Sequence, residues 1–175
     1  MTDKIKVGLI FGGNSSEYEV SIMSAHNIYE EIDTNKFDVY PMWITNDGYL
    51  ADDADSRRVL DNPKMEVANP HKVANISNIV ELKDRPEIDV FFPIVHGNLG
   101  EDGCLQGLFR VLDKPFVGDD VLAAAVTMDK EMTKILAQRA GVPVAKWIAV
   151  KRFEYNDPDN EKLDYEYVAS QLGSD

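Results

Sequence analysis

The sequence predicts an α/β fold with an open, Rossmann-like parallel sheet. Two apolar runs, 6–11 and 88–95, each end in a glycine-containing loop that is followed by residues with helical spacing. A compact apolar run bounded by turn residues is typical of a buried strand, and repeated strand–loop–helix units are typical of α/β proteins. Loops that follow parallel strands open at the carboxyl edge of the sheet, where such folds bind ligands. We therefore expect the loops at 12–17 and 97–103 to share one site.

The first predicted unit runs from strand to helix to strand. The strand at 6–11 is followed by Gly12-Gly13, and Ser16 and Glu19 then have the spacing of a helix capping box. Apolar residues recur at helical spacing over 18–33. The run at 37–44 is the second predicted strand, and the crossover through a helix makes it parallel to the first.

The middle of the chain carries weaker patterns. Residues 51–87 are polar and contain three prolines, so we expect short helices or edge strands there. His71 stands beside a proline in this region, and we expect it to be a solvated surface histidine. The region has one modest apolar cluster, Ile76, Ile79, Val80 and Leu82.

After the strand at 88–95, segments with helical spacing alternate with short strand-like apolar runs. We expect a helix at 104–112, a short strand at 114–118, and a helix at 121–126 that Asp119 or Asp120 can cap. A further helix at 130–140 ends at Gly141 and Pro143. A strand at 144–150, a polar linker at 156–162 and a helix at 165–172 that ends at Gly173 complete the prediction. A strand and helix added to a finished sheet suggest the start of a second domain.

Composition limits the class of function. The 175 residues suffice for one domain, or for one domain and part of another. The net charge of −13 argues against nucleic acid or an anionic membrane as the main partner. No apolar run is long enough to span a membrane or to serve as a signal peptide, so we expect a cytoplasmic protein. The single cysteine, Cys104, excludes an intramolecular disulfide, and its place in an apolar helix predicts a packed thiol rather than a nucleophile.

The two glycine loops carry the candidate site residues. Glu17 at the first loop can pair with an ammonium group, or can merely complement a helix N-terminus. His96 lies between an apolar strand and a polar loop, which favours a functional role over a hydrogen-bonded residue at a strand end. Glu101 and Asp102 precede a helix, which one of them can cap. The chain has no G-x-G-x-x-G fingerprint, P-loop, metal-spaced His/Cys cluster or G-x-S-x-G elbow.

Three segments resemble the D-alanine–D-alanine ligase family. Residues 11–21 (FGGNSSEYEVS) resemble its opening motif, residues 96–107 (HGNLGEDGCLQG) its second motif, and residues 128–143 (MDKEMTKILAQRAGVP) its third. The motifs occur in the family order. The resemblance covers the whole chain, whereas the chain covers about the first half of such an enzyme.

The resemblance implies an ATP-dependent ligase that joins two D-alanines for peptidoglycan synthesis. In the family, ATP phosphorylates the carboxylate of the first D-alanine, and the amine of the second attacks the acyl phosphate. The implied organisation is an α/β substrate-binding domain at 1–120 (the pre-ATP-grasp domain), followed at 121–175 by the truncated start of the ATP-grasp domain. Ligands for Mg²⁺ are expected beyond residue 175, the fragment alone should be inactive, and we expect a homodimer.

The resemblance also implies residue roles. The expected catalytic residues are Glu17, which pairs with the ammonium of D-alanine, and His96, which contacts or orients the first D-alanine while Glu101 holds the imidazole. The N–H groups of Gly97 and of the helix start at Gly103 would stabilise negative charge, and Lys130 would reach the phosphates of ATP. The implied substrate-binding residues are Val20, Ser21, Gly97 and Glu101.

The sequence leaves alternatives open. A ligase that adds D-serine or D-lactate differs mainly in residues beyond the end of this chain. A non-catalytic α/β module that binds a small amino acid is a second possibility, and a dimerisation domain that uses the helices at 18–33 and 104–112 is a third. Two departures from the family pattern are Tyr18, where a histidine or arginine is common, and Asp119-Asp120, where small residues are expected.

Overall fold

The computed structural model describes residues 3–65, 67–75, 88–156 and 164–173, and it divides into two compact units, 1–128 and 129–175. The first unit contains the sheet and the helices that cover it. The division falls one helix later than the predicted domain boundary after residue 120, because α5 (Val121–Met128) packs against α4 (Cys104–Val111) of the first unit. The assignment of 1–120 and 121–175 to two family domains stays a prediction.

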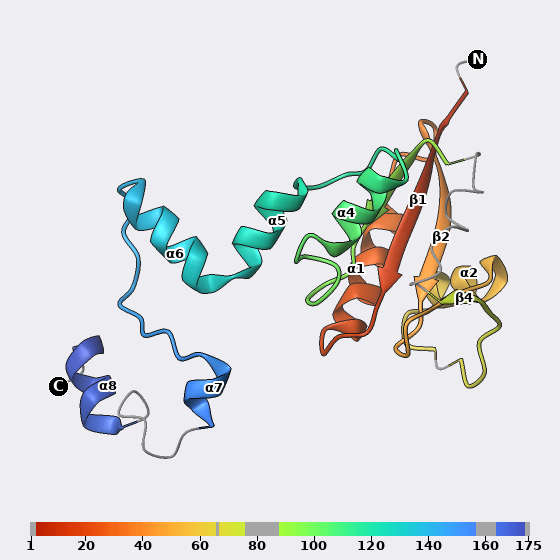
Figure 1. Ribbon diagram of the computed structural model, residues 1–175. Coiled ribbons are helices and arrows are strands. Elements are labelled where there is room, and N and C mark those ends of the chain that lie inside the picture. The colour runs from red at the N-terminus through yellow and green to blue at the C-terminus, as the bar shows by residue number, and fades with distance from the viewer. Residues whose placement is uncertain (1–2, 66, 76–87, 157–163, 174–175) are drawn as a thin grey trace. The chain divides into compact units, whose positions relative to one another are not determined.

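The sheet of the first unit has the strand order β4–β3–β2–β1–β5 (Figure 1). β1 (Ile5–Gly12) pairs in parallel with both β2 (Phe37–Ile44) and β5 (Val90–Pro93). β3 (Tyr49–Ala51) pairs antiparallel with β2, and β4 (Lys72–Asn75) pairs antiparallel with β3. The predicted parallel sheet is confirmed for its three central strands, and the whole sheet is mixed. The chain between β2 and β3 is too short for the crossover that a parallel pair requires.

Helices cover both faces of this sheet. α1 (Tyr18–Glu31) and α2 (Asp53–Asp61) pack on one face, and α4 packs on the other. Because side chains alternate across a strand, neighbouring residues of β1 enter different cores. The first core contains Leu9, Phe11, Ile22, Ala25, Val39, Trp43, Ala51, Val59 and Leu60. The second contains Ile10, Met42, Ile44, Ile88, Phe91, Val95, Leu105 and Phe109.

Several predicted elements differ from the structure. Residues 114–118 form only a single parallel bridge, between Phe116 and Phe91, instead of a strand. The strand predicted at 144–150 is wrong, since the described part of the second unit has no sheet ladder there. The second unit instead contains α6 (Lys130–Arg139), a short unpredicted α7 (Arg152–Tyr155) and α8 (Tyr165–Leu172). The predicted cluster from Ile76 to Leu82 and most of the linker at 156–162 lie outside the described residues.

Helix ends test the predicted caps. The capping box of Ser16 and Glu19 is wrong, because α1 begins after Glu17 and has no side-chain cap. Asp120 does contact the start of α5, where its carboxylate accepts the Val121 N–H at 2.7 Å. α8 ends, as predicted, at Gly173, whose φ of 74° suits the left-handed conformation that glycine adopts readily.

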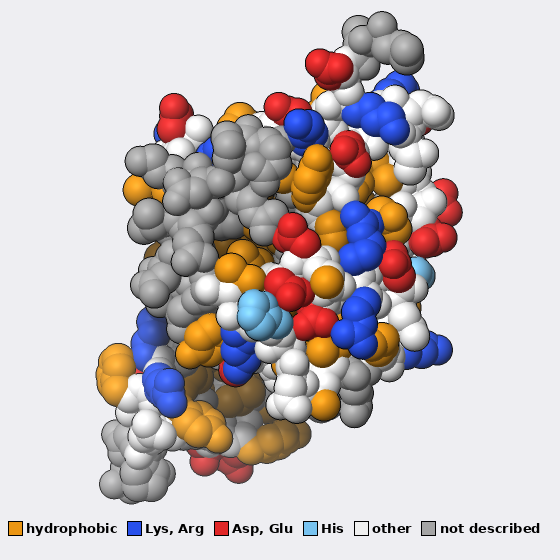
Figure 2. All heavy atoms as spheres, turned by 90° about the vertical axis from the view of Figure 1, so that its right-hand side faces the viewer, with side chains coloured by type: hydrophobic (Ala, Val, Ile, Leu, Met, Phe, Trp, Pro, Cys, Tyr) orange, Lys and Arg blue, Asp and Glu red, His pale blue; other side chains and the backbone are white. Residues whose placement is uncertain are grey.

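The exposure of two side chains, Cys104 and His71, tests two further predictions. Cys104 is exposed rather than packed, because it precedes the buried face that Leu105 and Phe109 form. His71 is exposed as predicted, with Nδ1 lying 3.3 Å from a carboxylate oxygen of Asp52. Acidic and basic side chains are interspersed over the face that carries α2 and β4 (Figure 2). Among the described residues, none of the helices has the length and apolar character needed to cross a bilayer.

Candidate functional site

The candidate site lies at the carboxyl ends of β1 and β5, two adjacent parallel strands. The chain leaves β1 toward α1 on one face of the sheet and leaves β5 toward α4 on the other face. Loops that diverge in this way border the sheet edge where open α/β folds bind ligands, and the space between these two loops is called the crevice. The loops at 12–17 and 97–103 do lie together, because Ser15 bonds to His96 directly before the second loop and the Glu17 carboxylate stands against Gly97. That they share one binding site stays a prediction.

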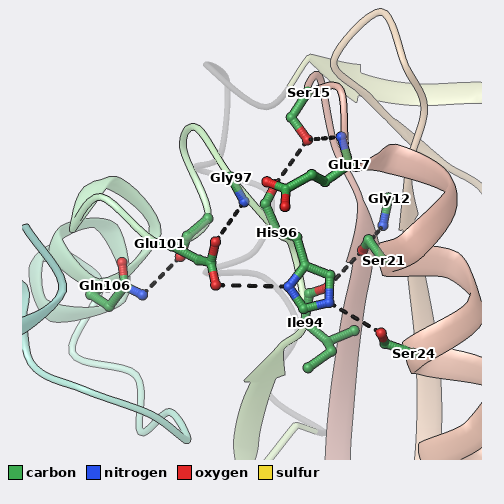
Figure 3. Close-up of polar contacts among 11 residues, drawn as sticks. Gly12, Ser15, Glu17, Ser21, Ser24, Ile94, His96, Gly97, Glu101 and Gln106 are labelled. Carbon is green, nitrogen blue, oxygen red and sulfur yellow. Dashed lines mark hydrogen bonds and ion pairs between the residues drawn. The ribbon is translucent and has the colours of Figure 1, made fainter. Parts of the chain in front are cut away.

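Two serines fasten these loops to each other (Figure 3). The Ser15 hydroxyl donates to the carbonyl of His96 at 2.8 Å and accepts the N–H of Glu17 at 3.1 Å. The Ser21 hydroxyl donates to the carbonyl of Ile94 at 2.6 Å and accepts the N–H of Gly12 at 2.8 Å. Each hydroxyl thus bonds to one backbone group of the segment that follows β5 and to one between the end of β1 and the start of α1, which links the two segments.

Glu17 extends its carboxylate across to the second loop. A β-carbon built on Gly97 would lie 2.7 Å from Glu17 Oε2, so the carboxylate stands directly against this glycine. Gly97 has a φ of 75°, which also disfavours a side chain at this position. Glu17 is the N-cap residue of α1, but its side chain makes no capping hydrogen bond. The carboxylate therefore remains exposed at the crevice, which favours the ammonium-binding role over a purely capping one.

His96 lies below Glu17 with its two ring nitrogens facing different groups (Figure 3). Nε2 is 3.1 Å from Ser24 Oγ, and Nδ1 is 3.8 Å from Glu101 Oε1. The second distance is within ion-pair range but too long for a hydrogen bond. The side chain of His96 is 26% exposed, so the ring stands at the surface of the crevice rather than inside the core. Glu101 lies beside the imidazole as predicted, and Ser24 makes the hydrogen bond.

Glu101 also accepts a hydrogen bond from the backbone N–H of Gly97, for which the sequence predicted a different partner. The N–H of Gly97 donates to Glu101 Oε2 at 2.8 Å. This N–H is expected to stabilise negative charge on a substrate, whereas here it donates to Glu101, and its role toward a substrate stays a prediction. Glu101 therefore braces the loop from Gly97 while facing His96.

The end of the second loop is braced by two more polar side chains. Asp102 accepts the N–H groups of Leu99 at 2.9 Å and of Cys104 at 3.0 Å. Partial burial would raise the pKa of Asp102, but these hydrogen bonds favour the carboxylate and bring the pKa below its ordinary value. The buried Gln106 donates to the carbonyl of Gly100 at 2.9 Å. Asp102 beside the thiol raises the pKa of Cys104, so the thiol is a poor nucleophile despite its exposure.

The two remaining predicted residues of the first motif are placed differently from each other. Val20 is 56% exposed, whereas Ser21 is fully buried. Their substrate-binding roles stay predictions, and the contacts of Ser21 give it a structural role in joining the loops. Sequence reasoning missed Ser24. A usable signal was present, because Glu17, Ser21 and Ser24 have the i, i+4, i+7 spacing of one helix face.

Tyr18, the departure from the family pattern, belongs to a separate pocket. Its hydroxyl accepts the Trp43 indole N–H at 2.9 Å, and burial raises the pKa of the phenol. Both side chains line an apolar pocket of about 630 Å³ between α1 and the chain that follows α2. The substitution therefore leaves Glu17 and His96 in place.

Lys130 belongs to the second unit, which is described by itself. It is the first residue of α6, where Asp129 caps the helix by accepting the N–H groups of Glu131 and Met132 at 2.9 and 3.0 Å. A pocket of about 220 Å³ is lined by three lysines (Lys130, Lys134 and Lys151), by Trp147 and by Glu131, which forms an ion pair with Lys151. Cationic side chains around a pocket suit phosphate groups. The predicted role of Lys130 toward ATP stays a prediction.

The described residues contain no group of three or more His, Cys, Asp or Glu side chains arranged to hold a metal ion. Two carboxylates near the crevice, Glu101 and Asp102, accept backbone N–H groups.

Comparison with known proteins adds independent findings. A family model described as the D-ala D-ala ligase N-terminus matches residues 6–119. The D-alanine–D-alanine ligase of Lactobacillus johnsonii is 99% identical over 175 residues, which cover 100% of this chain and 48% of that protein. The chain thus spans about half the length of the curated relatives it matches.

Solved structures agree with the family match. The VanG D-Ala:D-Ser ligase from Enterococcus faecalis superposes with a TM-score of 0.62 and is 33% identical, covering 87% of this chain and 47% of that one. A D-alanine–D-alanine ligase from Bacillus anthracis complexed with ATP superposes with a TM-score of 0.62 and is 25% identical, covering 93% of this chain and 43% of that one. The α/β fold predicted from the sequence is therefore shared with ligases about twice as long.

Proposed function

The chain belongs to the D-alanine–D-alanine ligase family, and we propose that it forms the first half of a cytoplasmic, ATP-dependent ligase that joins two D-alanines for peptidoglycan synthesis. Its task in that enzyme is to hold the first D-alanine. One observation carries the proposal: the Glu17 carboxylate stands against Gly97, in a crevice where His96 is also partly exposed. The two side chains come from segments almost 80 residues apart.

The charges at this crevice match one end of an amino acid. D-Alanine is a zwitterion, and its ammonium requires an anionic partner that is not already neutralised. Glu17 qualifies because its side chain makes no capping hydrogen bond and is exposed. His96 offers a ring nitrogen or a ring N–H to the substrate beside it. Holding the amino acid between these groups would orient its carboxylate for reaction, which lowers the entropic part of the barrier.

ATP supplies the phosphoryl group that activates the D-alanine carboxylate. Within this chain, Lys130 is our candidate for contacting its phosphates, since the pocket at the start of α6 gathers three lysines, of which Glu131 pairs with Lys151, and a tryptophan. A lysine ammonium acts there as a point charge that offsets the negative charge of the phosphates. Ligands for Mg²⁺ would come from beyond residue 175, and we propose a homodimer. The 175 residues alone would not ligate D-alanine.

A second candidate is a ligase that adds D-serine, which the likeness to the VanG D-Ala:D-Ser ligase favours. Both activities require the same first D-alanine, so the crevice of Glu17 and His96 fits either. The 99% identical relative is named for D-alanine, which makes D-alanine the preferred second substrate. Offering both amino acids to the complete enzyme and identifying the dipeptide by mass spectrometry distinguishes the two.

The test compares two glutamates at the start of α1, the N-cap residue Glu17 and Glu19 in the first turn. In the full-length Lactobacillus johnsonii ligase, Glu17→Gln should raise KM for the first D-alanine at least tenfold, equivalent to about 1.4 kcal/mol. Glu19→Gln removes the same charge two residues away, from an exposed residue outside the crevice, and should leave KM nearly unchanged. Equal effects of the two substitutions would contradict a specific ammonium contact. Unchanged kinetics in Glu17→Gln would remove Glu17 from the site of the first D-alanine.

A further inference from the structure

We propose that Ser24 is the positioning residue of His96: its hydroxyl holds Nε2, so that the ring is oriented with Nδ1 toward Glu101. Ser24 lies in the middle of α1, outside the glycine loops. The catalytic consequence rests on the proposed function, whereas the positioning itself can be tested separately.

The geometry joins three segments through one ring. Ser24 Oγ lies 3.1 Å from Nε2 of His96, and Glu101 Oε1 lies 3.8 Å from Nδ1. The backbone of His96 is held independently, because its carbonyl accepts the Ser15 hydroxyl at 2.8 Å. Fixing the backbone leaves the two side-chain torsions of the histidine free. The contacts of Ser24 and Glu101 on opposite sides of the ring determine those torsions (Figure 3).

The partners also determine which ring nitrogen carries the proton in neutral His96. A carboxylate only accepts hydrogen bonds, and its negative charge favours an N–H on the nearer nitrogen. Glu101 therefore favours the tautomer with hydrogen on Nδ1. Nε2 is then an acceptor, and the Ser24 hydroxyl donates to it. In the imidazolium form the same hydroxyl can rotate and accept the Nε2 proton, so it supports the same orientation in both states.

A purely structural role for Ser24 predicts something different. Serine in a helix interior commonly bonds to a carbonyl of its own helix, but Ser24 bonds to a ring 72 residues away. Alanine has the higher helix propensity. Replacing Ser24 by alanine should therefore leave the stability of α1 unchanged or slightly increased, while His96 loses a partner. In Ser24→Ala, the stability of α1 should therefore be kept while the orientation of the His96 ring is lost.

The experiment uses the full-length Lactobacillus johnsonii ligase with ¹⁵N-labelled histidine rings. Spectra are recorded near pH 9, well above the ordinary imidazole pKa of about 6.5, and His96 is assigned by the loss of its signals in His96→Gln. We expect the Nδ1–H tautomer with a hydrogen-bonded Nε2. In Ser24→Ala, the Nε2 resonance should move toward the position of a free acceptor, and Ser24→Thr should restore it. Asn27→Ala, an exposed position one turn along α1, is the control for the helix.

Kinetics of the same variants then separate the two proposals. Ser24→Ala should raise KM for the first D-alanine about three- to tenfold without changing KM for ATP, and Ser24→Thr should recover most of the loss. Unchanged ring resonances in Ser24→Ala would overturn the positioning role, whatever the kinetics. A shifted Nε2 resonance with unchanged kinetics would support Ser24 as the positioning residue, and would refute the proposed contact of His96 with D-alanine.

Discussion

Removing the Ser21 hydroxyl is the strongest test of how the two loops are joined. Ser21 is fully buried and makes hydrogen bonds of 2.6 and 2.8 Å to the backbone of Ile94 and Gly12. A typical hydrogen bond contributes about 0.5–1.5 kcal/mol net, and leaving a buried partner unsatisfied costs about 1–3 kcal/mol. Ser21→Ala removes both bonds at once, so we expect the free energy of unfolding to fall by roughly 2–3 kcal/mol.

The control is Ser16→Ala. The capping box read from the sequence would make Ser16 the costly position, at about 1 kcal/mol. It would also leave Ser21 as a helix residue that alanine replaces at no cost. The structure predicts the opposite order, since Ser16 is exposed and α1 has no side-chain cap. The Ser16 variant should remain within about 0.5 kcal/mol of the parent.

Urea unfolding measures both variants. The chain has two tryptophans, and Trp43 is 4% exposed in the first core. In a Trp147→Phe background, the fluorescence of Trp43 therefore reports the first unit alone. With a slope of about 2 kcal/mol/M, Ser21→Ala should lower the urea midpoint by roughly 1 M. A loss below about 0.5 kcal/mol, or a greater loss in Ser16→Ala, would refute the reasoning.

Three further predictions concern backbone strain, pH and nucleotide use. Gly12→Ala should lower the free energy of unfolding by more than the roughly 1–3 kcal/mol of backbone strain at its φ of 89°, because the added carbon would lie 2.1 Å from the carbonyl oxygen of Ile44. Gly118 has a φ of 122° and no atom within 4 Å of an added carbon, so Gly118→Ala should lose only the strain energy in the same unfolding assay. Asp102→Asn should be destabilising at neutral pH and progressively less so below about pH 4. The lowered pKa of Asp102 gives a contribution that is present above the unfolded pKa and lost as the pH falls through the folded one, and a difference in unfolding free energy that did not vary with pH would contradict this. Lys130→Ala in the full-length enzyme should raise KM for ATP at least tenfold, and wild-type ATP kinetics would remove it from the nucleotide site.

The central strands were predictable because burial leaves a strong local pattern. The runs at 6–11, 37–44 and 88–95 are apolar and bounded by turn residues, and each overlaps one of the three parallel strands. β3 and β4 have only three and four residues, which is too few to display a period. The run at 144–150 has a strand-like composition, but a strand exists only where another strand pairs with it. Pairing partners are distant in sequence and cannot be read from the segment itself.

The loops of the candidate site were predictable from the sequence, whereas the side-chain hydrogen bonds that hold these loops were not. Glu17 and His96 are recognisable because polar groups follow apolar strands, and they lie near each other because Ser15 bonds to the backbone of both. Their shared contact with a substrate stays a prediction. The capping box failed because spacing alone does not determine where a helix begins. Ser15 accepts the N–H of Glu17 and donates to His96, so the loop continues to Glu17 and α1 begins after it.

The pairing of Ser24 with His96 follows from two periodicities taken together. Side chains alternate across a strand, and along β5 and its extension Phe92 and Ile94 pack against the core beneath α1, whereas Phe91 and Val95 enter the core beneath α4. The same alternation, continued by two residues, directs His96 toward α1. On α1, the face that carries Ser21 one turn earlier also carries Ser24. α1 and β5 pack against the same core, so the polar residues that follow their apolar ones lie together at the edge of that core. Ser24 and His96 meet there.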